Sequence, residues 1–222
     1  MKKTVSLRKI FLISSIMLLF SASLMGCGGD ISKVQRTIHK PVIYIYPTSE
    51  HQVKVQLNYD GKLTCTYPEY NDGWDVIARP DGTLTNITDN REYSYLYWEG
   101  ITDTELDMSR GFVVKGEDTE KFLQEKLEYM GLIPKEYNEF IVYWLPILQE
   151  NNYNFISFAG NDYEDLAQLK ITPEPDSILR VMMIYKSLDK PIQVEEQELK
   201  TFTRVGFTVV EWGGIEEKGI MK

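Results

Sequence analysis

The sequence predicts a β-rich α+β fold, in which an antiparallel, sandwich-like front half (residues 41–100) continues into an α+β back half (residues 101–214). The front half consists of β-branched and aromatic runs separated by turn residues such as Asp60-Gly61 and Asp81-Gly82. The back half contains a segment, residues 117–130, whose apolar residues recur at helical spacing. Because no Gly/Ser-rich or Pro-rich linker separates the halves, we expect one domain over residues 41–214, followed by a tail at 215–222.

Six runs in the front half have the composition and length of strands. They cover residues 41–46, 53–57, 63–67, 74–79, 83–87 and 91–98. In the third run Leu63, Cys65 and Tyr67 alternate with threonines, so we expect Cys65 to lie in the apolar row. A buried Cys65 would act as a small hydrophobe. The alternative, a nucleophilic thiol, lacks a histidine downstream of residue 51 to activate it.

The back half contains segments with helical spacing and segments with the composition of strands. Residues 117–130 are predicted to be helical, with Asp118 as a candidate N-cap and Gly131 just beyond the end. Residues 161–169 should contain a short helix with Asp162 as its cap. The remaining apolar runs are β-branched and aromatic, and we expect strands at residues 111–115, 140–145, 154–159, 178–188 and 206–212.

The N-terminus has the three parts of a signal peptide over residues 1–26: a cationic start, an apolar core of residues 10–20 and a small, weakly polar end. The run Leu24-Met25-Gly26-Cys27 resembles the lipobox of bacterial lipoproteins. The resemblance implies that Cys27 carries a diacylglyceryl thioether and becomes the first residue after cleavage. Residues 27–40 would then be a lipidated tether. The alternative is an ordinary secretory signal with a chance cysteine.

The net charge of the chain limits the partners that it can bind. Without residues 1–26, which contain four basic and no acidic residues, the formal net charge changes from −9 to −13. Such a chain repels nucleic-acid phosphates and anionic lipid headgroups, so we expect no nucleic-acid partner. Attachment to a bacterial membrane from the extracytoplasmic side would require the acyl anchor on Cys27.

The residue inventory excludes several kinds of catalytic site. His39 and His51 are the only histidines, which rules out a histidine-rich zinc centre, and no HExxH motif or GxSxG elbow occurs. Phosphate-binding glycine motifs are also missing. We therefore expect no metal and no cofactor, and chemistry, if present, would depend on carboxylates or tyrosines.

Two runs, YSYLYWEG at residues 93–100 and VVEWGG at residues 209–214, supply the candidate site residues. Glu99 and Glu211 could be the two carboxylates of a glycan hydrolase. The simpler interpretation makes them strand-end carboxylates that pair with arginines. In strand register Trp98 and Glu99 point to opposite faces, as do Glu211 and Trp212. The candidate binding aromatics are Tyr95, Tyr97, Trp98 and Trp212.

The runs KPVIYIYP, YSYLYWEG and GFTVVEWGG together resemble a group of bacterial extracytoplasmic proteins with KPVIYLYP, YLYWEG and FTVVEWGG-type runs. The resemblance covers nearly the whole chain after the signal peptide. It implies a location, and no reaction or catalytic residue comes with it. We therefore expect a lipid-anchored binding or envelope-structural module, with an envelope protein or a glycan as the partner; the alternative is a surface hydrolase that acts on glycans through Glu99 and Glu211.

Replacing Cys27 with Ser should abolish incorporation of labelled fatty acid and block processing between Gly26 and Cys27, because a hydroxyl cannot form the thioether. Metabolic labelling with palmitate, followed by gel analysis, measures both effects. Cys65→Ser is the matched control and should leave labelling unchanged. Labelling that survives Cys27→Ser would contradict the anchor.

Overall fold

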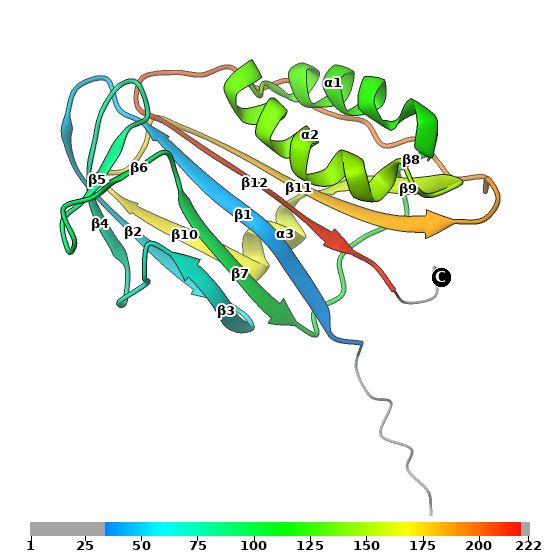
Figure 1. Ribbon diagram of the computed structural model, residues 1–222, viewed down its shortest axis with the longest axis horizontal. Coiled ribbons are helices and arrows are strands. Elements are labelled where there is room, and N and C mark those ends of the chain that lie inside the picture. Colours follow the sequence, from blue (N-terminus) through cyan, green and yellow to red (C-terminus); the bar gives the residue numbers. More distant parts are fainter. Residues whose placement is uncertain (1–33, 219–222) are drawn as a thin grey trace, which may run out of the picture. The chain divides into compact units, whose positions relative to one another are not determined.

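Residues 34–218, the part of the chain described by the computed structural model, form two β-sheets and three α-helices (Figure 1). The seven-stranded sheet has the order β3 (Lys62–Tyr67), β7 (Leu96–Thr102), β1 (Arg36–Tyr46), β12 (Thr208–Glu216), β11 (Ser177–Leu188), β9 (Tyr153–Ala159) and β8 (Phe112–Lys115). The five-stranded sheet has the order β10 (Ala167–Thr172), β2 (His51–Tyr59), β4 (Trp74–Ala78), β5 (Leu84–Asn86) and β6 (Glu92–Tyr93). Every neighbouring pair is antiparallel except β11 and β12.

The two faces of the seven-stranded sheet have different neighbours. Helices α1 (Thr119–Met130) and α2 (Pro134–Leu148) lie on one face (Figure 1), and their apolar residues form one core with that face. The opposite face forms a second core with the five-stranded sheet and α3 (Asn161–Leu166). Alternation along β12 illustrates the division, because Val209 belongs to the inter-sheet core, whereas Val210 and Trp212 belong to the helix-side core.

Strand β1 contains a bulge at Lys40. Its register shifts between Ile38 and Val42 against both neighbouring strands, and Lys40 has a φ of 51°. Ile38 lies in the inter-sheet core, but Val42 lies in the helix-side core, although residues four apart in a regular strand share a face. The extra residue therefore exchanges the two faces of the strand.

The predicted β-rich character is confirmed, but the division into a front and a back half is not a division in space. Strands β1, β3 and β7 from the front half share a sheet with four strands from the back half. Strand β10, from the back half, pairs with β2 in the five-stranded sheet. Both sheets thus depend on long-range pairings, such as β1 with β12 and β2 with β10, which local sequence patterns do not specify.

Several segment predictions require correction. Residues 140–145, predicted as a strand, lie inside α2, because Phe140, Ile141, Trp144 and Leu148 form one buried stripe at helical spacing. Strand β1 begins at Arg36, inside the predicted tether, and β12 continues to Glu216, inside the predicted tail.

The predictions for Cys65, for the helix at residues 117–130 and for the N-terminal segment have different outcomes. Cys65 is exposed rather than part of the apolar row, because β3 is an edge strand with a register shift between Leu63 and Cys65. The helix at residues 117–130 is confirmed as α1, which ends at Gly131 with a φ of 105°. Cys27 and the signal segment lie outside the described residues. Within residues 34–218 no helix is long and apolar enough to span a membrane.

Gly214 should not tolerate a side chain, because a Cβ atom there would lie 2.4 Å from Cζ2 of Trp144. Gly214→Ala should therefore lower the free energy of unfolding by about 1–3 kcal/mol, the usual cost of overpacking a core. Urea denaturation measures the loss. The control is the same substitution in a Trp144→Phe background, where the clashing indole atoms are gone and the additional loss should be smaller. Equal losses in both backgrounds would contradict this account of Gly214.

Candidate functional site

The three runs that the sequence singles out lie side by side in the structure. KPVIYIYP forms β1, YLYWEG lies on β7 and VVEWGG lies on β12, and β1 pairs with both of the other strands. Val42 illustrates the arrangement, because it lies opposite Tyr97 on one side and Trp212 on the other. The bulge of β1 therefore lies where all three runs meet.

The bulge places a basic side chain among aromatic rings. The Lys40 Nζ lies 5.1 Å from the ring centroid of Tyr143, on α2, and 5.3 Å from that of Trp212. Both distances are in the range of a cation–π contact. The His39 ring meets Trp144 edge-on, with 6.4 Å between centroids. We call this group, together with Glu99, the Lys40 cluster; its members are His39, Lys40, Glu99, Tyr143, Trp144 and Trp212.

The Glu99 carboxylate contacts the bulge directly. Its Oε1 accepts a hydrogen bond of 3.2 Å from the backbone N–H of Lys40 and lies 3.8 Å from Nδ1 of His39. The bulge takes this N–H out of the regular β-ladder, so the carboxylate supplies an acceptor that the neighbouring strand does not. The Glu99 side chain remains 24% exposed. It can therefore support the backbone and still meet a ligand.

Burial dominates the electrostatics of the cluster. It lowers the pKa of Lys40, and the nearby Glu139 carboxylate opposes that shift. Burial raises the pKa of Tyr143, and the negative charge of Glu99 raises it further. The pKa of Tyr97 rises for the same two reasons. The tyrosines thus stay neutral near pH 7 and can donate or accept hydrogen bonds.

Glu211 lies in the other core. Its side chain is fully buried between the sheets, where Nε of Arg180 donates to Oε2 at 2.7 Å and Nε1 of Trp98 donates to Oε1 at 3.0 Å. The Arg180 guanidinium also stacks on the ring of Tyr163, 4.6 Å from its centroid. Glu99 faces the helix side, so the two glutamates lie on opposite faces of one sheet. The Glu99–Glu211 pair suggested by the sequence is therefore wrong, and the pairing of Glu211 with arginine is confirmed.

The four candidate binding aromatics differ in burial. Tyr95 and Tyr97 are half-buried and pack at the margin of the helix-side core, where they can meet a ligand. Trp98 and Trp212 are fully buried, which excludes them as surface contacts. Trp98 hydrogen-bonds Glu211, and Trp212 lies beneath the Lys40 ammonium. Both tryptophans are structural, because each lies on an interior strand of the sheet and is enclosed by one of the two cores.

A comparison with known proteins gives one informative match. The "Uncharacterized protein in bglA 3'region" of Butyrivibrio fibrisolvens is 35% identical to this chain over 97 residues, which are 42% of this chain and 99% of that protein. The chain belongs to the same family as this protein. No protein-family model matches the chain, and no solved structure matches it. The membership supplies no activity, so the site must be interpreted from its geometry.

Two charged residues near the tyrosines were missed by the sequence analysis. Glu139 lies on α2 and acts on both Lys40 and Tyr95, but its segment directly precedes residues that were predicted as a strand. Lys40 was placed in the tether. The dipeptide Lys40-Pro41 was the available signal, because proline has no N–H and often marks an irregular strand position. Within residues 34–218 no group of three His, Cys, Asp or Glu side chains could hold a metal ion.

The Lys40 amine should titrate below the ordinary lysine value of about 10.4, because burial disfavours its charged form. Glu139→Gln removes the charge that opposes this shift, so the pKa of Lys40 should fall further. NMR titration of ¹³C-methylated lysines, with the signal assigned through Lys40→Arg, measures the pKa. Glu150→Gln, just beyond the end of α2, is the control and should leave it unchanged. A Lys40 pKa at the ordinary value would contradict this description.

Proposed function

We propose that this protein is a lipid-anchored extracytoplasmic module that binds a glycan through the surface around Tyr95, Tyr97 and Tyr143. One observation carries the proposal: the half-buried Tyr97 and Tyr143 lie beside the partly exposed Glu99 and Lys40 on the helix side of the sheet. Tyr95 lies on the same side, near Glu139. Tyrosine offers an apolar ring face with a polar tip, and the charged groups add directed hydrogen bonds. Sugar rings require both kinds of contact.

Binding is favoured over hydrolysis by the orientation of the carboxylates. Glycoside hydrolysis requires two carboxyl groups about 5–9.5 Å apart on either side of one bond. Glu211 is enclosed between the sheets by Arg180 and Trp98 and cannot reach a ligand on the helix side. Glu99 is engaged with the backbone of the bulge. The surface thus has the contacts that hold a sugar without the pair that would cleave it.

The proposed anchor would keep the binding surface close to a membrane. Lys40 is the thirteenth residue after Cys27. Even a fully extended chain spans at most about 3.6 Å per residue, so Lys40 would lie within about 47 Å of the lipidated residue. A glycan of the cell envelope is within that reach. The lipobox at residues 24–27 supports this placement, and the acidic charge of the remaining chain means that the anchor alone would maintain it.

We also propose that the fold is best classed as α+β with a sandwich-like arrangement of its sheets. The inter-sheet core supports this class, because it takes residues from both sheets, including Val55 and Trp74 on one side and Ile43 and Val209 on the other. The two long helices lie outside the sandwich, against the seven-stranded sheet.

Tyr97→Ala should weaken glycan binding at least tenfold, because central tyrosines contribute strongly to binding surfaces. The full chain in detergent, applied to an array of cell-envelope and plant polysaccharide fragments, measures binding, and circular dichroism checks folding. Tyr129→Ala is the matched control, since Tyr129 is 53% exposed on α1, away from this surface. Wild-type protein that binds no glycan, or a Tyr97→Ala variant that binds as well as wild type, would contradict the proposal.

A further inference from the structure

Strand β8 is the last strand of the seven-stranded sheet and leaves one edge open. It pairs with β9 alone. The Gly111 N–H donates away from β9, to the carbonyl of Glu195 at 2.9 Å, whereas the Gly116 N–H donates to Asn152, on the β9 side, at 3.3 Å. Backbone groups alternate along a strand, so the N–H and C=O of Val113 point away from β9. Within residues 34–218 no hydrogen bond joins them to the connection that runs past this edge.

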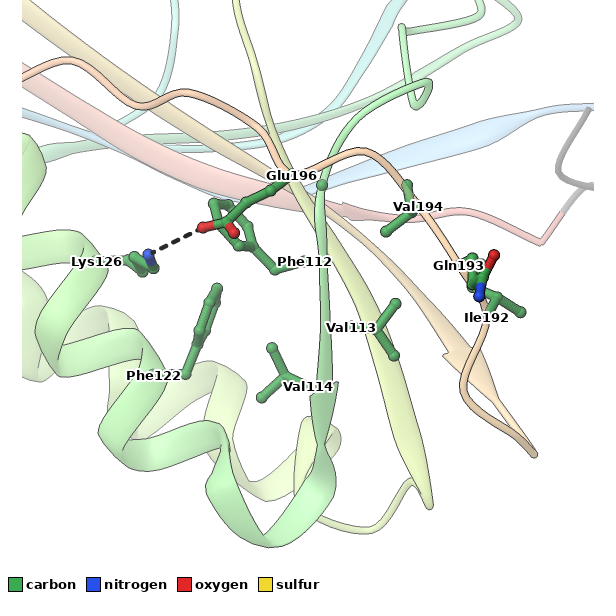
Figure 2. A pocket seen from close by; sticks show the side chains of 10 residues that line it. Phe112, Val113, Val114, Phe122, Lys126, Ile192, Gln193, Val194 and Glu196 are labelled. Carbon is green, nitrogen blue, oxygen red and sulfur yellow. Dashed lines mark ion pairs between the residues drawn. The ribbon is translucent and has the colours of Figure 1, made fainter.

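Apolar side chains flank this edge on both sides (Figure 2). On the α1 side Phe112, Val114 and Phe122 point into a pocket of about 630 Å³, and Val113 points the other way, toward Ile192 and Val194. A neighbouring pocket of about 600 Å³ shares Val113, Val114, Phe122 and Ile192 and continues along the strand to Tyr153. The two pockets together form a trough with an unpaired strand edge along its length.

This geometry matches an incoming strand rather than a compact ligand. The side chains of an added strand point alternately to the two faces of the sheet, and here each face has an apolar wall beside the open edge. The connection between β11 and β12 is hydrogen-bonded to this edge just before β8, where Gly111 donates to Glu195 and Arg110 forms a bridge with the same residue. Farther along, Ile192 and Val194 form the opposite wall of the trough, and among the described residues no backbone hydrogen bond joins them to β8.

The charges at the covered end indicate which peptide fits. Glu195, Glu196 and Glu198 are all exposed there. Glu196 reaches Lys126 only at 4.0 Å, and this lysine also lies over the ring of Phe112, 4.6 Å from its centroid. Arg110 forms an ion pair of 2.9 Å with Glu195, so Glu196 and Glu198 carry the charge that faces a partner at this end. A basic residue in the partner would complement these two carboxylates, whereas an acidic one would be repelled.

We propose that the open edge of β8 is a docking site for an extended segment of a partner protein, with β-branched side chains toward both walls and a basic residue at the Glu196 end. The segment adds to the seven-stranded sheet as an eighth strand. Backbone hydrogen bonds with Val113 supply affinity that does not depend on sequence. The two apolar walls select side chains that present methyl groups on both faces, and the glutamates set the polarity of the segment. This site is separate from the Lys40 cluster, so it does not depend on glycan binding.

A synthetic peptide of alternating valine and threonine between terminal lysines, labelled with fluorescein, tests the proposal with the full chain in detergent. Fluorescence polarisation should show saturable binding. Two N-methylated versions provide the decisive comparison, because N–H groups of alternate residues leave opposite edges of a strand. Methylation of one alternate set should abolish binding, and methylation of the other set should leave it within threefold. Equal behaviour of the two versions, or no binding of the parent peptide up to 1 mM, would overturn the proposal.

Variants of the protein then locate the site. Phe122→Ala removes part of the wall on the α1 side and should weaken binding about tenfold, and Glu196→Lys should weaken the lysine peptide but not a version with terminal glutamates. Ile147→Ala, at an exposed position on α2, is the control and should have no effect. Sedimentation of the protein alone tests a second copy as the occupant. Dimerisation that the peptide disrupts, or that Phe122→Ala abolishes in the absence of peptide, would replace the partner segment with the second copy and overturn the proposal.

Discussion

The bulge at Lys40 determines what each face of the central strand β1 carries. Beyond the bulge Ile43 and Ile45 face the inter-sheet core, and regular alternation back from them would direct His39 into that core and Ile38 out of it. The extra residue reverses this assignment. Ile38 fills the core, and the imidazole of His39 lies on the helix side near Glu99. A polar ring buried between the sheets without a partner would cost about 1–3 kcal/mol, and the bulge avoids that cost.

The arginine–glutamate pair between the sheets has a different role. Arg180 and Glu211 lie opposite each other across the parallel pairing of β11 and β12. Burying two charges contributes little net stability, but leaving one of them unpaired costs about 3–5 kcal/mol. A one-residue slip of this pairing would separate the charges and turn one of them to the opposite face. The pair, with Trp98 on the second carboxylate oxygen, therefore favours a single register at the centre of the sheet.

Local patterns in the sequence specified much of the fold and little of the site. Turn signals and alternation located most strands, and the spacing of Leu123, Leu127 and Met130 predicted α1. The same reasoning failed for residues 140–145, where β-branched and aromatic residues favour a strand but the tertiary packing of Phe140 and Trp144 decides for a helix.

The contacts of the candidate site residues could not be predicted from local sequence patterns. Glu99 meets Lys40 across 59 positions of sequence and Trp98 meets Glu211 across 113, so only the sheet order could reveal those contacts. The register of Trp98 and Glu99 was nevertheless predicted correctly, because alternation within one strand is a local property.

The position of β12 in the sheet has a consequence for how the chain can fold. Strand β12, residues 208–216, lies between β1 and β11, so in the sheet formed by the described residues it joins the group β3-β7-β1 to the group β11-β9-β8. A chain that emerges N-terminus first, from a ribosome or a translocation channel, cannot close this sheet until residue 216 has emerged. Until then the two groups of strands on either side of β12 have uncovered apolar faces and strand edges. Such surfaces make the incomplete chain a substrate for chaperones. Closure of the seven-stranded sheet is therefore coupled to completion of the chain as far as residue 216.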